Sequence, residues 1–226
     1  METAWLVRTR DRGVPVSGGR PNDAVVVIVL GWACAPRCVE HVRPAGCDVV
    51  CLFDFRGEIA DPGLPLADYP RRYLFAWSFG VWVAERIFSG VEWTRAVALC
   101  GSPYPVDARR GIDPKRMNVT LRGIHKYGID EFNRRMYGPK EYARLAPWLP
   151  FRDREANECE LIGLCEGSLE PYEPSIRWDR AVVGTDDVIF PVENLTAYWG
   201  ERAEVLPLPH YPFGDSDLIE REINGR

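Results

Sequence analysis

Six short apolar runs recur along this chain, and none of them has the alternating polar residues of a half-exposed strand. Runs of this kind are typical of parallel strands whose two faces are both covered. Stretches with helical spacing lie between them, notably at 79–88 and 192–199. Strand and helix therefore alternate, which predicts an α/β fold with a mostly parallel sheet. The predicted strands are 24–30, 49–55, 73–77, 96–100, 181–184 and 205–208.

Two features near the N-terminus lie outside this alternation. Residues 5–10 predict an additional, antiparallel edge strand ahead of the others. The pair Gly18-Gly19 stands in a polar stretch rather than between a strand and a helix. It therefore predicts a hairpin turn and not a phosphate-binding loop.

The alternation breaks in a long interval between about 101 and 180, which holds helix-like pieces such as 129–136 and several prolines. An insertion after a central strand of an open α/β sheet lies over the carboxyl ends of the strands, where ligands bind. We therefore expect one domain over residues 1–226, with a helical lid insertion at about 103–178.

Length and composition exclude several classes of protein. A chain of 226 residues suits one domain, and its 46% hydrophobic content and eight tryptophans exclude a disordered one. No apolar run approaches the roughly 20 residues that a membrane span needs. The N-terminus lacks the basic start and apolar core of a secretory signal. We expect a cytoplasmic protein that does not enter the membrane.

The seven cysteines agree with a reducing compartment. Their number is odd, and Cys51 and Cys100 fall within or at the end of predicted core strands. Cys34 and Cys38 have the spacing of a metal-binding pair, but no second pair with finger-like spacing accompanies them. The cysteines are therefore expected to be buried or half-buried thiols, without a metal site.

The charge distribution points to an acidic partner. The net charge of −5 argues against nucleic-acid binding. Residues 109–154 nevertheless carry twelve Lys or Arg against five Asp or Glu, a local balance of +7, so the rest of the chain is near −12. A positive middle segment on an acidic body favours an acidic binding partner.

Ser78 stands where the apolar run 73–77 ends and the helical stretch 79–88 begins. A serine at such a strand-to-helix turn has the setting of a nucleophile elbow, whose strained backbone needs small residues two positions before and after the serine. Ala76 and Gly80 occupy those positions. The pattern predicts that Ser78 is a nucleophile.

A serine nucleophile needs a base, and a base needs an orienting acid. His210 follows the last predicted strand, where a triad in the order Ser, acid, His has its base. His41, on a predicted surface helix, suits a solvated role. His125, in the basic segment, suits either contact with a partner or a solvated role. The acid is Asp187 or Asp186, after the strand 181–184; Asp187 is favoured because Asp186 suits a hydrogen bond within the turn.

The oxyanion of the tetrahedral intermediate needs two preorganised N–H donors. The amide of Phe79 follows the nucleophile at a helix N-terminus, where unpaired amides and the helix dipole favour negative charge. The amide of Trp32 follows the most hydrophobic predicted strand and the glycine that ends it. These two amides are the predicted oxyanion hole.

Eight short stretches carry a wider resemblance, and four of them contain the candidate catalytic and oxyanion-hole residues. They are Gly31-Trp32, Phe53-Asp54-Phe55-Arg56, Ala76-Trp77-Ser78-Phe79-Gly80, Gly101-Ser102-Pro103-Tyr104-Pro105-Val106, Arg109-Arg110-Gly111-Ile112, Phe132-Asn133-Arg134-Arg135-Met136, Asp187-Val188-Ile189-Phe190-Pro191-Val192-Glu193-Asn194 and His210-Tyr211-Pro212-Phe213. Over most of its length the chain thus resembles the α/β-hydrolase superfamily and, more narrowly, the BioG-type pimeloyl-acyl-carrier-protein methyl ester esterases of biotin synthesis. It departs from that family at Ala33 and Ala76, where glycine is frequent.

The resemblance implies an α/β-hydrolase fold, with helices on both faces of the sheet and a helical lid. It implies a serine esterase that removes the methyl ester from pimeloyl-acyl-carrier protein and releases methanol, with no metal or organic cofactor. The alternatives are a broad carboxylesterase for small esters and a non-catalytic acyl-binding protein. The chain is expected to be a monomer.

The same resemblance gives the basic segment a partner, because acyl carrier protein is strongly acidic. An apolar channel would hold the acyl chain, with Trp32, Trp77, Phe79, Phe132 and Met136 as its expected lining. The residues expected to contact the carrier are Arg116, Arg122, Lys126, Arg134, Arg135 and Arg144.

Overall fold

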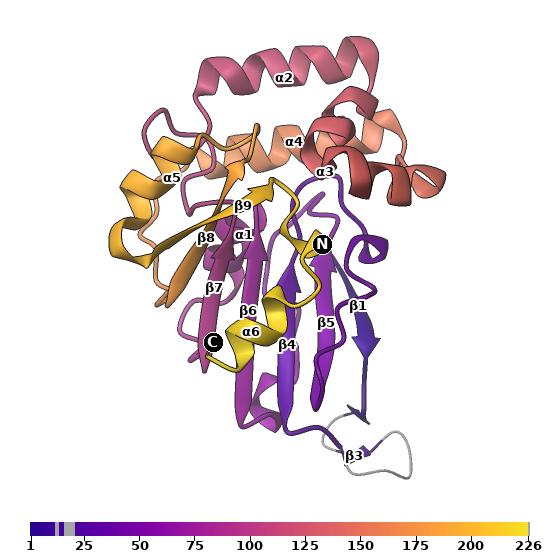
Figure 1. Ribbon diagram of the computed structural model, residues 1–226, viewed down its shortest axis with the longest axis vertical. Coiled ribbons are helices and arrows are strands. Elements are labelled where there is room, and N and C mark those ends of the chain that lie inside the picture. Colours follow the sequence, from indigo (N-terminus) through magenta and orange to yellow (C-terminus); the bar gives the residue numbers. More distant parts are fainter. Residues whose placement is uncertain (12–13, 16–20, 226) are drawn as a thin grey trace.

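The computed structural model describes residues 1–11, 14–15 and 21–225 (Figure 1). Near the start of the chain, β2 (Arg10–Asp11) pairs with β3 (Val14–Pro15) in antiparallel orientation. The turn predicted at Gly18-Gly19 lies outside the described residues.

A twisted sheet forms the centre of the molecule. Among the described residues it has seven strands in the order β1-β5-β4-β6-β7-β8-β9. β1 is antiparallel to β5, and all other neighbours are parallel. The strands are β1 (Glu2–Val7), β4 (Ala24–Val29), β5 (Cys47–Phe53), β6 (Arg71–Trp77), β7 (Arg95–Leu99), β8 (Arg180–Asp186) and β9 (Ala203–Pro209). The predicted α/β fold is confirmed, and the predicted edge strand begins at Glu2 instead of residue 5.

The predicted apolar run 24–30 is uninterrupted because β4 is covered on both faces of the sheet. Every residue of β4 is fully buried, and Val27 pairs with Val50 of β5 and Leu74 of β6. Because successive side chains point to opposite faces, Val25, Val27 and Val29 enter one hydrophobic cluster and Val26 and Ile28 the other. A strand buried on both faces has no position for a polar residue.

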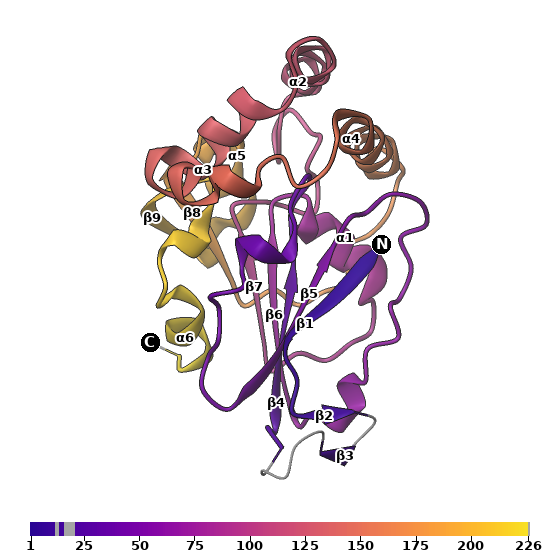
Figure 2. The ribbon, with the colours of Figure 1, turned by 90° about the vertical axis from the view of Figure 1, so that its right-hand side faces the viewer.

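Helices cover both faces of the sheet. Figure 2 shows α1 (Gly80–Ile87) on one side of the sheet and α6 (Leu218–Ile223) on the other. The cluster that includes α1 also contains Leu195 and Trp199 of α5 (Val192–Trp199). Short 3₁₀ turns occupy Pro36–Cys38, Leu66–Asp68, Ala146–Trp148, Gly200–Arg202 and Pro212–Gly214.

Three helices between β7 and β8 form a layer above the carboxyl ends of the parallel strands (Figures 1 and 2). We call them the cap: α2 (Pro114–Tyr127), α3 (Asp130–Leu145) and α4 (Arg154–Ser168). Asp113 and Asp153 cap the N-termini of α2 and α4 by accepting hydrogen bonds from Lys115 N and Ala156 N. Gly138, at φ 71°, interrupts α3. The long interval is therefore helical, and it lies over the edge of the sheet that carries Ser78.

Other expectations have mixed outcomes. Six of the seven cysteines are buried and only Cys159 is exposed, all as free thiols. The helix expected around His41 is wrong: the 3₁₀ turn ends at Cys38, and His41 lies in a following turn with its Nε2 2.8 Å from the carbonyl oxygen of Phe213. None of the helices among the described residues is long and apolar enough to span a membrane.

Candidate active site

Ser78 occupies a tight turn between β6 and α1, with φ at 60°. A left-handed backbone is strained for a residue with a side chain, as expected for a nucleophile elbow. The surrounding glycines make this turn possible. A Cβ at Gly80 would lie 2.4 Å from Val29 O, and a Cβ at Gly101 would lie 2.5 Å from Ser78 O. Neither position can accept a side chain without displacing backbone.

His210 and Asp187 meet Ser78 at the carboxyl edge of the sheet. His210 Nε2 lies 3.0 Å from Ser78 Oγ, and His210 Nδ1 lies 2.8 Å from Asp187 Oδ2. With its proton on Nδ1, the imidazole donates to Asp187 and accepts from the Ser78 hydroxyl. The three side chains were predicted from separate stretches of sequence, and the structure brings them into one hydrogen-bonded row. All three residues are buried.

The local sequence holds Asp187 in this orientation. Its second carboxylate oxygen, Oδ1, accepts hydrogen bonds from the amides of Ile189 (2.8 Å) and Phe190 (2.9 Å). Phe190 also stacks on the His210 ring, with the two planes 5° apart. Asp186 is exposed, and its Oδ1 accepts from the hydroxyl of the adjacent Thr185. The geometry therefore supports Asp187 over Asp186 as the acid.

The two amides predicted to bind an oxyanion flank Ser78. Within the described part of the chain, neither Trp32 N nor Phe79 N donates to another group. The strand-end loop that carries Trp32 passes directly beside the serine, because a Cβ at Gly31 would lie 3.4 Å from Ser78 Oγ. Phe79 precedes the first turn of α1, where the helix dipole favours negative charge. Two unpaired donors beside a nucleophile suit an oxyanion hole.

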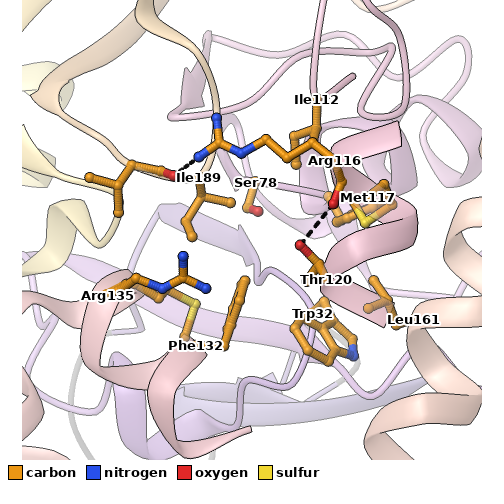
Figure 3. Close-up of a pocket in the computed structure, with 13 residues that line it drawn as sticks. Trp32, Ser78, Ile112, Arg116, Met117, Thr120, Phe132, Arg135, Leu161 and Ile189 are labelled. Carbon is orange, nitrogen blue, oxygen red and sulfur yellow. Dashed lines mark hydrogen bonds between the residues drawn. The ribbon is translucent and has the colours of Figure 1, made fainter. Parts of the chain in front are cut away.

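An apolar pocket opens above Ser78, between the sheet and the cap. Figure 3 shows Trp32, Phe132 and Leu161 on one side of it, with Ile189 and Ile112 nearer the serine. About 530 Å³ of space within it is free of protein atoms, its open mouth included. The complete lining is Trp32, Ser78, Phe79, Ile112, Arg116, Met117, Thr120, Phe132, Arg135, Met136, Leu161, Val188 and Ile189.

This lining contains four of the five residues expected along an acyl channel. Trp77 is the exception, because its side chain is fully buried beneath the site and does not reach the pocket. It packs instead against His210 and donates from its indole to the His210 carbonyl oxygen. A residue that precedes the nucleophile on a strand points to the opposite face, so this outcome follows from the strand geometry.

The six basic residues expected to meet a carrier divide into three settings. Arg116 and Arg135 line the pocket, and Arg116 donates to Val188 O (Figure 3). Arg134 pairs with Asp130, and Arg144 pairs with Glu141 and donates to the Tyr211 hydroxyl. Arg122 and Lys126 are exposed and line a groove between α2 and α4.

These settings differ in the charge that remains available to a partner. Among the described residues, neither Arg122 nor Lys126 has an acidic partner within ion-pair distance. Arg134 and Arg144 each lie against a carboxylate. Of these four residues, Arg122 and Lys126 therefore present the less compensated positive charge.

The two remaining histidines lie away from Ser78. His125 is exposed on α2, with its Nδ1 3.1 Å from a carboxylate oxygen of Glu158. His41 contacts the chain near Phe213, as described above. Across the described residues, no group of three or more His, Cys, Asp or Glu side chains is arranged to hold a metal ion.

Sequence reasoning missed Glu160, a fully buried carboxylate on α4. It accepts hydrogen bonds from Ala33 N and Phe55 N, which follow two different strands of the sheet. Burial raises the pKa of Glu160, and Arg152 opposes this by pairing with the carboxylate. No sequence signal marks the residue, because a single glutamate in an amphipathic helix has the pattern of a solvated one.

Comparison with known proteins places this site in context. Residues 18–215 match the model of a family described as pimeloyl-ACP methyl esterase BioG. The solved structure of BioG from Haemophilus influenzae superposes with a TM-score of 0.80 at 27% identity and covers 95% of both chains. An uncharacterized protein of the same organism is 30% identical over 198 residues, which are 85% of this chain and 90% of that protein.

A further relative is much longer than this chain. It is the malonyl-[acyl-carrier protein] O-methyltransferase of Bacteroides fragilis, 29% identical over 194 residues. The match covers 83% of this chain but 39% of the methyltransferase, so this chain spans well under half the length of that relative.

Proposed function

The chain belongs to the BioG family of pimeloyl-ACP methyl esterases, and on this premise we propose that it hydrolyses the methyl ester of pimeloyl-acyl-carrier protein in biotin synthesis. It is a carboxylic ester hydrolase, and we propose here which ester it cleaves and which residues carry out the reaction. The observation that carries the proposal is the hydrogen-bonded row of Ser78, His210 and Asp187, in which Ser78 lines an apolar pocket.

The proposed reaction begins with attack of Ser78 Oγ on the ester carbonyl carbon. His210 takes the hydroxyl proton through Nε2, and Asp187 stabilises the imidazolium through Nδ1–H. The amides of Trp32 and Phe79 bind the oxyanion of the tetrahedral intermediate. When this intermediate collapses, His210 protonates the departing methanol and an acyl group remains on Ser78.

A water molecule completes the cycle. His210, neutral again, removes a proton from the water as it attacks the acyl-enzyme, and the same two amides bind the second oxyanion. Collapse returns the proton to Ser78 and releases the free carboxylate of pimeloyl-acyl-carrier protein. Each step uses groups of this chain and water alone.

The pocket supports an acyl chain as substrate. Its side walls are Trp32, Phe132, Leu161 and Met117, which suit a run of methylene groups. Arg116 and Arg135 also line it and bring positive charge beside the apolar walls (Figure 3). The apolar walls suit the acyl chain, and the two arginines suit the anionic carrier to which the far end of that chain is attached.

The identity of the carrier is supported by charge and by one relative. The segment 109–154, which contains α2 and α3, has a balance of +7 on a chain of net charge −5. The relative from Bacteroides fragilis is named for adding a methyl group to malonyl-acyl-carrier protein. The ester bond that such a methyl transfer creates is of the same type as the bond this chain would cleave.

The direct test incubates the purified protein with pimeloyl-acyl-carrier protein methyl ester and measures the mass of the carrier. We expect the loss of one methylene unit and the release of methanol in stoichiometric amount. Ser78→Ala should lower kcat on the order of 10⁴–10⁶-fold. Unchanged hydrolysis by Ser78→Ala would place the reaction elsewhere, and no wild-type hydrolysis of any ester would leave a non-catalytic acyl-binding protein.

A second arm separates a carrier-directed esterase from a broad one. The same enzyme is assayed on a small free methyl ester of pimelate and on the carrier-bound ester. A broad carboxylesterase would have similar kcat/KM on both, with little dependence on salt. The carrier-directed enzyme should prefer the carrier-bound ester, and the preference should fall as salt rises.

Charge reversal on α2 tests the docking of the carrier. Arg122→Glu with Lys126→Glu should raise KM for the carrier-bound ester and leave the small ester unaffected, because both side chains lie outside the pocket above Ser78. Arg177→Glu is the matched control, because Arg177 is exposed at the amino end of β8, away from the cap. An equal effect of the control would remove support for docking at α2.

A further inference from the structure

The loop after β4 is attached to the cap at three consecutive residues. The indole Nε1 of Trp32 donates to Asn157 O at 2.7 Å, and Ala33 N donates to Glu160 Oε2 at 2.9 Å. Cys34 O accepts from Arg152 Nη1 at 3.0 Å. The residues that hold this loop lie on α4 or just before it, although more than a hundred residues of chain separate them from it.

Glu160 is the centre of this attachment. It is fully buried, and its two carboxylate oxygens bind different partners. Oε2 accepts from Ala33 N and pairs with Arg152, while Oε1 accepts from Phe55 N at 2.8 Å. One side chain thus joins the loops that follow β4 and β5 to each other and to the cap.

The loop needs such an anchor because of its backbone. Ala33 has φ at 59°, in the left-handed region, which its Cβ disfavours and which glycine adopts freely. The peptide group that donates to Glu160 is the one between Trp32 and Ala33, next to the peptide group that carries Trp32 N–H. Fixing the Ala33 amide and the Trp32 indole therefore fixes the direction of the unpaired Trp32 N–H beside Ser78.

We propose that Glu160 is a positioning residue, whose carboxylate, held by Arg152, keeps the loop of Trp32 in the conformation that directs its amide at the oxyanion. This proposal rests on the assignment of Trp32 N–H to the oxyanion hole and on ester hydrolysis, and not on the carrier protein. A carboxylate is required because two oxygens face two backbone N–H groups, and glutamine would present an NH₂ group to one of them.

The role predicts a specific kinetic signature. An oxyanion donor stabilises the transition state rather than the bound substrate, so a displaced donor lowers kcat and leaves KM nearly unchanged. A trifluoromethyl ketone, which forms a tetrahedral adduct with the serine, should lose affinity by the same factor as kcat/KM falls. A merely structural residue would change the thermal midpoint without this correlation.

The experiment compares Glu160→Gln with Glu85→Gln, on a small methyl ester and well below both thermal midpoints. Glu85 is the matched control: it is buried on α1 and accepts from Ser175 N, Ile176 N and Trp178 Nε1, away from the pocket. We expect Glu160→Gln to lower kcat about 10–100-fold, with KM within threefold, since a misplaced catalytic group costs up to about 10²-fold. Glu85→Gln should lose thermal stability and keep kcat within threefold.

Glu160→Asp covers the case in which Glu160→Gln does not fold. It keeps the charge that pairs with Arg152 but is one methylene group shorter, so it cannot reach both amides. A fall in kcat of more than threefold, with unchanged KM and a matching loss of inhibitor affinity, supports the proposal. It is overturned if the variant that folds keeps kcat within threefold of wild type, if inhibitor affinity stays constant while kcat falls, or if Glu85→Gln loses kcat equally.

Discussion

The indole of Trp77 donates a hydrogen bond of 2.8 Å to the carbonyl oxygen of His210, across 133 positions of sequence. The residue that precedes the proposed nucleophile is thereby tied to the backbone of the proposed base. Both residues are buried, so water cannot replace this hydrogen bond. The hydrogen bond fixes the end of β6 relative to the loop after β9 and so keeps Ser78 and His210 within hydrogen-bond distance of each other.

Trp77→Phe tests this link. The variant keeps an aromatic ring but leaves the carbonyl of His210 without its partner, so we expect a loss of about 1–3 kcal/mol in the free energy of unfolding. The histidine then has more freedom, and kcat should fall while KM stays the same. Urea unfolding and steady-state kinetics measure the two effects. A stable variant with wild-type kcat would show that the hydrogen bond does not position His210.

Asp187 and Asp186 are adjacent, yet the structure gives them opposite settings. Asp187→Asn should lower kcat by about 10³–10⁴-fold, because an amide opposite Nδ1–H no longer favours the tautomer that lets Nε2 accept the serine proton. Asp186→Asn changes an exposed side chain, so its kcat should stay within twofold of the wild-type value. Steady-state kinetics on one ester decides, and equal losses in the two variants would contradict the assignment of the acid.

The close approach of Gly101 to Ser78 predicts a stability effect. A Cβ at Gly101 would lie 2.5 Å from Ser78 O and 2.9 Å from Ser78 Cα, so Gly101→Ala should destabilise the fold by at least about 1–3 kcal/mol. Gly123→Ala is the control, because Gly123 lies within α2 and its added Cβ has no heavy atom within 4 Å apart from its chain neighbours and the backbone of its own helix. It should stabilise the fold by up to about 1 kcal/mol. Thermal unfolding of both variants checks the contrast.

The Asp54–Arg56 pair predicts a dependence of stability on pH. The guanidinium of Arg56 donates two hydrogen bonds of 2.6 Å to Asp54 and holds the pKa of that carboxyl below its usual range. A lowered folded-state pKa means that the stabilisation is complete above the ordinary aspartate pKa of about 4. It is then lost as the pH falls from there through the folded-state pKa.

The difference in unfolding free energy between wild type and Asp54→Asn should therefore shrink as the pH falls below about 4. Arg56→Met should show the same convergence, since it removes the cause of the lowered pKa. Urea titrations at neutral and acidic pH measure both. A difference that stays constant over this range would mean that the pair does not contribute in the way its geometry indicates.

Local sequence signals were sufficient for several of these features. The buried strands could be recognised because a strand covered on both faces has only apolar positions. Ser78 could be recognised because the elbow demands small residues at fixed offsets, and Ala76 and Gly80 supply them. Ser78, Asp187 and His210 follow β6, β8 and β9 in chain order, and the carboxyl ends of these parallel strands lie at one edge of the sheet.

Other features had no local signal. Four of the five residues expected along an acyl channel line the pocket, but Trp77 belongs to the core, because strand residues alternate between the two faces. The six basic residues look alike in the sequence, but Arg134, Arg135 and Arg144 each lie within ion-pair distance of a carboxylate. Arg116 and Arg135 line the pocket. Which positive charges remain for a partner depends on neighbours that are brought close by folding.

The amino-acid sequence by itself determined the alternation of strands and helices, the elbow at Ser78 and the positions of His210 and Asp187 at strand ends, because hydrophobic period and chain order carry this information. Only the tertiary structure decided that Glu160 of α4 reaches the loops after β4 and β5. The physical reason is that a buried carboxylate is stable only where several donors converge on it, and that convergence is a property of packed elements rather than of neighbouring residues.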